Sequence, residues 1–228
     1  MKLKTLGLLS ASFVVAQLMT MNAMAGSEKA MDQILPAKNM TMKSYESDGS
    51  PEGLRALAVH GSLQTRSSAF VVRHAVEDHI RTTVDTDKSY TPAEANTHAE
   101  IAQTIKERIH AKQDEVHALV TSIAKEEKGQ APAALPEARS DIVMGESKEG
   151  DHAGIHELNT TTLRRNHQIV GAVEDLKGTA SKDKYIKLHH TMKELHEGQK
   201  DLYHKHMKPH HNAKHIEAHE ALVAEIKG

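Results

Sequence analysis

The fold is indicated most clearly by TPAEANTHAEIAQTIKERIHAKQDEVHALVTSIAKEEK, residues 91–128. Thr91 and Glu94 have the spacing of a capping box, and Pro92 fits the first helical position, where its missing N–H is not needed. Behind this start, apolar residues recur every three or four positions, which is the period of one helix face. They are Ile101, Ile105, Ile109, Val116, Leu119 and Ile123. The stretch therefore predicts one long helix that ends near Lys128.

Five further segments show a helical period. Pro51 follows a capping serine and precedes an acidic residue, which is typical of a helix start, and Gly61 is expected to end that helix. Gly178 and Pro209 are expected to end two later helices. The predicted helices are 50–61, 67–86, 152–177, 182–207 and 212–227. Because no segment alternates as a strand does, the sequence predicts an all-α fold, an elongated bundle of five or six helices.

Composition divides the chain and limits its core. Residues 128–151 contain two prolines and three glycines and show no sustained period, which is typical of a linker. We expect an irregular N-terminal arm at 26–49, one helical part at 50–127, and a histidine-rich helical part at 152–228. Leu, Ile, Val and Phe make up 37 of the 203 residues from 26 to 228. This low share predicts short apolar stripes and a thin core.

Residues 1–25 have the composition of a cleavable signal peptide. Lys2 and Lys4 precede the mostly apolar run 6–18, and Ala23-Met24-Ala25 offers the small residues that precede a cut. The apolar run is too short and too interrupted to span a bilayer well. We expect a periplasmic or secreted protein that begins at Gly26 and has no transmembrane segment in its mature chain.

Charge and motifs exclude several classes of function. Without Lys2 and Lys4 the chain has 27 basic and 31 acidic residues, which argues against a nucleic-acid partner. It has no cysteine, so neither a disulfide framework nor a thiolate metal site can form. Three His-Glu dipeptides lack the second histidine of the HExxH zinc-protease motif. We expect no enzyme, no catalytic residue and no cofactor other than a metal ion.

The predicted helix 182–207 carries two stripes with different chemistry. One stripe is a mainly apolar seam, formed by Tyr185, Leu188, Met192, Leu195, Gln199, Leu202 and His206. The other stripe lies on the opposite side and is polar, formed by His190, Glu194, Glu197, Asp201 and His204. Since histidine is a weaker helix former than Lys, Glu or Gln, its choice on a polar face suggests a specific use.

Histidines gather toward the C-terminal end. His211, His215 and His219 are spaced four apart, so neighbouring rings can share one metal ion, and His190 with Glu194 repeats this spacing. The predicted metal ligands are His204, His206, His210, His211, His215, His219, His190 and Glu194. Imidazole and carboxylate ligands suit Zn²⁺, Cu²⁺ or Ni²⁺, and protons would compete with them as the pH falls toward about 6. We expect reversible binding of a divalent transition metal in the cell envelope, as a buffer or resistance factor.

The same residues allow a second interpretation. Protonation of all 18 histidines would carry the mature chain from −4 to +14, and a bundle with a thin core would feel that repulsion. Such a protein would loosen in acid and associate with itself or with an envelope protein, as a chaperone does. The sequence leaves open the choice between metal binding and a response to pH.

Overall fold

The computed structural model describes residues 49–84, 91–139 and 148–208, and its regular structure there is entirely helical. The π-helical turn η1 joins α5 to α6 without a break, and the π-helical turn η2 extends α8. The described residues therefore form four helical rods, namely α4, α5–η1–α6, α7 and α8–η2, which confirms the all-α prediction. Their bounds are α4 Pro51–Val84, α5 Pro92–Gln103, η1 Thr104–His110, α6 Ala111–Lys128, α7 Lys148–Glu174, α8 Lys182–Leu202 and η2 Tyr203–Met207.

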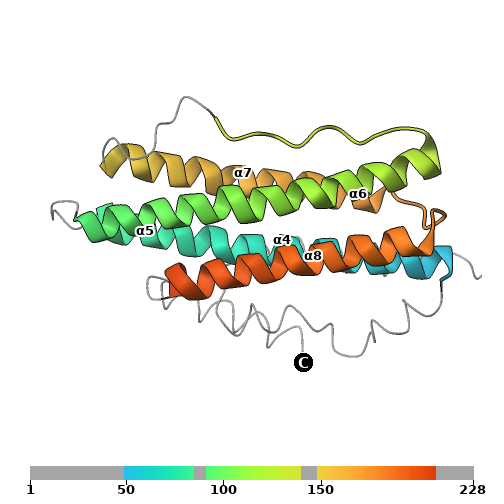
Figure 1. Cartoon of the computed structure of the whole chain (residues 1–228), viewed down its shortest axis with the longest axis horizontal. Coiled ribbons are helices and arrows are strands. Elements are labelled where there is room, and N and C mark those ends of the chain that lie inside the picture. The colour runs from blue at the N-terminus through green and yellow to red at the C-terminus, as the bar shows by residue number, and fades with distance from the viewer. Residues whose placement is uncertain (1–48, 85–90, 140–147, 209–228) are drawn as a thin grey trace, which may run out of the picture.

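The four rods lie side by side as an elongated bundle (Figure 1). The rods α4 and α8–η2 run in one direction, and α5–η1–α6 and α7 run in the other. The guanidinium of Arg55 near the start of α4 donates to the carbonyl of Glu174 at the end of α7, 2.9 Å away. At the other end, Lys205 after α8 pairs with Glu100 on α5 at 3.1 Å. Each of these pairs joins two antiparallel neighbours.

Two successive helices, α6 and α7, run parallel because the chain between them returns along the bundle (Figure 1). The described part of this return, residues 129–139, lies against the helices. The amide of Gln168 donates to the carbonyls of Ala133 at 2.8 Å and Ala134 at 2.6 Å. Leu135 packs on the hydrophobic core. The return segment is therefore fixed to the bundle by side chains of α7.

The predicted helix starts have the expected local chemistry. The Oγ1 atom of Thr91 accepts from the N–H of Glu94 at 3.3 Å, and the Glu94 carboxylate accepts from the N–H of Thr91 at 2.7 Å. The Oγ atom of Ser50 likewise accepts from the N–H of Gly53 at 3.1 Å. These three hydrogen bonds satisfy backbone N–H groups that a helix start leaves without a partner. The helices beginning at Pro51 and Pro92 are thus confirmed.

The prediction that Gly61 ends a helix is wrong. The segments 50–61 and 67–86 form one continuous helix, α4, that ends at Val84. Gly61 is buried where α4 meets α8, and a Cβ atom on it would lie 2.8 Å from Met192 Sδ and 3.0 Å from His189 Nδ1. A glycine here allows two helices to approach closely and does not break the one that contains it. The predicted helix 212–227 and the arm 26–48 lie outside the described residues.

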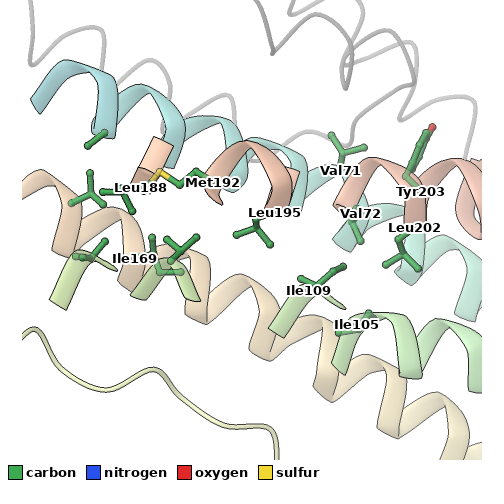
Figure 2. Packing of buried hydrophobic residues seen from close by; sticks show 14 of the residues in the cluster. Val71, Val72, Ile105, Ile109, Ile169, Leu188, Met192, Leu195, Leu202 and Tyr203 are labelled. Atoms are coloured by element: carbon green, nitrogen blue, oxygen red, sulfur yellow. The ribbon is translucent and has the colours of Figure 1, made fainter. Parts of the chain in front are cut away.

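One hydrophobic cluster runs through the bundle and receives side chains from all four rods (Figure 2). Val72 of α4, Ile105 and Ile109 of η1, Ile169 of α7 and Leu195 of α8 all point into it (Figure 2). Helices from both predicted helical parts contribute to this cluster. The core is long and narrow, as the apolar composition suggests.

The carboxylate of Glu127 binds the backbone of the turn between α7 and α8. Glu127, near the end of α6, accepts hydrogen bonds from the backbone N–H groups of Lys177 at 2.6 Å, Thr179 at 2.7 Å and Ala180 at 3.0 Å. It also accepts from the Tyr185 hydroxyl at 2.8 Å. Burial raises the pKa of Glu127, but these donors outweigh burial and lower the pKa below its ordinary value. The carboxylate is therefore a structural ligand for the turn.

We expect Gly178→Ala to destabilise the bundle by about 3 kcal/mol or more. Gly178 has a φ of +80°, and a Cβ atom would lie 1.8 Å from the carbonyl oxygen of Pro51. Gly129 is the matched control, because its φ is +70° and nothing lies within 4 Å of its Cβ position. Gly129→Ala should lose only about 1 kcal/mol, from the left-handed conformation alone. Urea unfolding followed by circular dichroism measures both, and equal losses would contradict the contact with Pro51.

Candidate functional site

The two stripes predicted on α8 are confirmed by burial. Every member of the predicted seam is buried, namely Tyr185, Leu188, Met192, Leu195, Gln199, Leu202 and His206. In the polar stripe, His190, Glu194, Glu197 and Asp201 are exposed, and His204 is half-buried. The second stripe therefore faces away from the core, as predicted.

The predicted pair His190 and Glu194 lies on an open groove beside α8. The groove has a volume of about 660 Å³ and is also lined by Gln64 of α4 and Arg108 of η1. Lys112 of α6 donates to the Glu194 carboxylate at 3.0 Å. The two side chains thus share a surface, but a metal ion would have to compete with an ammonium group for the carboxylate.

Two of the six predicted C-terminal ligands lie within the described residues. His206 is buried, and its Nε2 atom is 3.6 Å from the Glu100 carboxylate, which also pairs with Lys205. Burial and the charge of Lys205 lower the pKa of His206, while the charge of Glu100 opposes them. His204 stacks edge-on against Tyr203, with ring centroids 5.4 Å apart. The other four ligands, His210, His211, His215 and His219, lie outside the described residues.

No group of three or more His, Asp or Glu side chains is arranged to hold a metal ion within residues 49–84, 91–139 and 148–208. The predicted ligand set is therefore not assembled in this part of the chain.

Sequence reasoning placed His206 on a buried seam but missed that many other histidines lie inside the bundle. These other buried histidines are His79, His98, His110, His152, His189 and His196. A signal for some of them exists, because His98 precedes Ile101 and Ile105 at helical spacing, and His189 and His196 directly follow seam residues. In a four-helix bundle each helix packs against two neighbours, so its buried face is wider than one seam. The interior is thus partly built of imidazole rings.

His110 is buried against α7 and contacts two residues of that helix. Its Nε2 atom is 2.8 Å from the Thr162 hydroxyl of α7, and the guanidinium of Arg165 donates to its backbone carbonyl at 3.3 Å. Arg165 is itself buried and pairs with Asp114. Burial, reinforced by the charge of Arg165 and opposed by a hydrogen bond with the Leu158 backbone, lowers the pKa of His110 to about 4. This histidine is therefore kept neutral near pH 7.

His60 of α4 is half-buried and also has a lowered pKa. Burial lowers the pKa of His60, whose ring lies 6.4 Å from that of His189 on α8. Imidazole rings thus lie on both sides of the contact between α4 and α8.

Three other buried histidines meet at one end of the bundle. The ring of His98 lies nearly perpendicular to that of His79, at 86° with centroids 5.1 Å apart. The same ring lies 4.9 Å from that of His152, at 64°. We call these three residues the histidine triad.

Comparison with protein-family models, with curated proteins and with solved structures finds no match. Among the helices in the described ranges, none is long and apolar enough to cross a membrane.

We expect Arg165→Gln to raise the pKa of His110 from about 4 toward its ordinary value. The substitution removes the buried charge that repels a protonated imidazole, and it releases the Asp114 carboxylate, which favours that form. Burial remains, so the rise should be partial. An NMR titration of the His110 ring protons measures it. The neighbouring exposed Arg164→Gln is the control, and an equal pKa in both variants would contradict a role for Arg165.

Proposed function

We propose that this chain is an exported, non-enzymatic helical protein whose bundle opens on acidification and then presents its apolar interior to partner proteins. The observation that supports this most directly is the burial of His110 beside the buried guanidinium of Arg165. A second positive charge at this place would repel the first in surroundings that water screens poorly. Export is proposed from the pattern of residues 1–25.

Proton linkage gives the direction of the response. The pKa of His110 is about 4 in the folded chain and 6.5 in an unfolded one, so the unfolded chain binds more protons between these values. The stability that the neutral ring contributes is complete above about pH 6.5 and is lost as the pH falls toward about 4. The loss amounts to about 3 kcal/mol, which is a large part of the stability of a small domain.

Other charges near His110 do not offset this effect. Asp114, on the same rod, already pairs with Arg165. The hydrogen bond with the Leu158 backbone favours the charged ring, but its effect on the pKa is smaller than those of burial and of the Arg165 charge.

Opening would expose a surface suited to protein partners. The hydrophobic cluster runs through all four rods, and separating any rod uncovers part of it. Because large exposed apolar patches bind proteins or aggregate, an acid-opened bundle would associate with itself or hold a partly unfolded client. This is the physical basis of the proposed chaperone-like role.

We expect His110→Gln to weaken the pH dependence of stability. Glutamine can keep a hydrogen bond to Thr162 but does not titrate, so the difference in unfolding free energy between pH 7.5 and 4.5 should shrink by about 2–3 kcal/mol. The exposed His167→Gln on α7 is the control and should keep the full difference. Urea unfolding at both pH values measures the effect.

Binding of an apolar dye, such as anilinonaphthalene sulfonate, tests the opening itself. The wild-type chain should bind the dye progressively below about pH 6, and His110→Gln should require a lower pH. Identical acid profiles in the wild type and His110→Gln would contradict the proposal.

Metal binding by the C-terminal histidines is our second proposal. The feature that favours it is the buried His206 ring facing the Glu100 carboxylate at 3.6 Å, which brings an imidazole and a carboxylate together across two rods. The remaining imidazoles would come from His204 and from the segment after Pro209. Zn²⁺, Cu²⁺ or Ni²⁺ would be held as buffer or resistance cargo.

We expect the full chain to bind Zn²⁺ with a Kd below about 10 µM at pH 7.5, and much more weakly at pH 5.5, because protons compete for the ring nitrogens. Replacing His210, His211, His215 and His219 with alanine should weaken this binding at least tenfold. Replacing His117, His156 and His167, which lie elsewhere, should not. Isothermal calorimetry distinguishes the variants, and unchanged affinity in the C-terminal variant would contradict this second proposal.

A further inference from the structure

The histidine triad brings together three segments that are distant in the sequence. His79 lies near the end of α4, His98 lies near the start of α5, and His152 lies near the start of α7. The three residues are 3%, 0% and 7% exposed. Each comes from a different rod, so folding of the bundle assembles the group. Neither proposal above uses it.

The spacing of the rings resembles that around a bound ion. An ion held by ring nitrogens at about 2.0–2.1 Å lies about 3.2 Å from each ring centroid, so two rings on a tetrahedral ion have centroids about 5 Å apart. The centroids of His79 and His98 are 5.1 Å apart, and those of His98 and His152 are 4.9 Å apart. His98 therefore has the separation from each of the other two rings that shared ligation requires, although the ring nitrogens are not arranged around one point.

We propose that the histidine triad binds one divalent transition-metal ion through three imidazole nitrogens. Turning each ring about its terminal torsion directs the nitrogens inward, and that torsion is broad for histidine, so the backbone can stay in place. Three imidazoles without a thiolate suit Zn²⁺, Co²⁺, Ni²⁺ or Cu²⁺. Water or a small anion takes the remaining position.

Two acidic residues of α4, Glu77 and Asp78, directly precede His79 in the sequence and can balance part of the added charge. Asp78 is buried next to His79 and pairs with Arg81 at 3.5 Å. Glu77 lies 3.1 Å from His156, one turn beyond His152 on α7. Carboxylates that surround imidazole ligands stabilise a bound cation and orient the rings.

The proposed ion would stabilise the bundle at a place separate from His110. His98 and His110 are twelve residues apart on one rod, which is about 18 Å along a helix. An ion shared by three rods ties the end of α4 to the starts of α5 and α7. Metal binding would therefore raise the midpoint of thermal unfolding by mass action, because the unfolded chain lacks the assembled group.

Cobalt titration of a chain that lacks the C-terminal ligands tests the inference. The background is the full chain with His210, His211, His215 and His219 replaced by alanine, which removes four of the six imidazoles of the second proposal. Binding that is lost with His98 is then assigned to the triad. We expect one Co²⁺ per chain, with the intense visible absorption of a four-coordinate site. His98→Asn in this background should weaken binding at least tenfold and abolish the increase in Tm.

His156→Gln is the matched control, since it removes an exposed imidazole one turn from His152 and should leave binding unchanged. Absence of Co²⁺ binding in the background chain, or unchanged binding in a folded His98→Asn variant, would overturn the inference. If His98→Asn does not fold, X-ray absorption of the metal-loaded background chain decides instead. Three imidazole ligands support the triad, and two or fewer refute it.

Discussion

The packing of this bundle depends on imidazole rings that lie in its interior. Each of the four rods buries at least one histidine, from His79 on α4 to His206 after α8. A buried charge without compensation is far more unfavourable than a buried neutral ring with a hydrogen bond. The hydrophobic cluster and the imidazoles share the same interior, and burial is the largest cause of the lowered pKa of His110 and of His206.

The thin apolar core follows from this mixed interior. Small polar residues of α4 turn their hydroxyls back onto their own helix, as Thr65 does to the carbonyl of Ser62 at 2.9 Å. On α7, Asn166 donates to the carbonyl of Thr162 at 3.0 Å. Such contacts satisfy buried polar groups without a partner on another helix. A sequence with few Leu, Ile, Val and Phe residues can therefore form a closed bundle, because its interior also accepts polar side chains that carry their own partners.

The sequence could predict features that depend on residues close together in the chain, but not features that depend on distant residues. The start of α5 follows from Thr91 and Glu94, three residues apart, and the α8 seam follows from spacing within one helix. Gly61 is needed because Met192 of α8 lies against it, and the Glu194 carboxylate is bound by Lys112 of α6. In both cases the two residues are distant in the sequence. The burial of His110 likewise depends on a neighbouring rod that a single-helix pattern does not contain. The helical segments were therefore predictable from local chemistry. The surroundings of each histidine could be known only from the packing of the four rods.

Fixed charges add to burial in distinguishing the histidines from one another. A proton and a metal ion both place positive charge on an imidazole, so any group that repels one also repels the other. His110 lies beside buried Arg165, which disfavours both cations there and is the basis of the proposed acid response. In the triad, His79 directly follows Glu77 and Asp78, whose carboxylates favour a cation. The two proposals thus assign different uses to the same side chain according to the fixed charges near each ring.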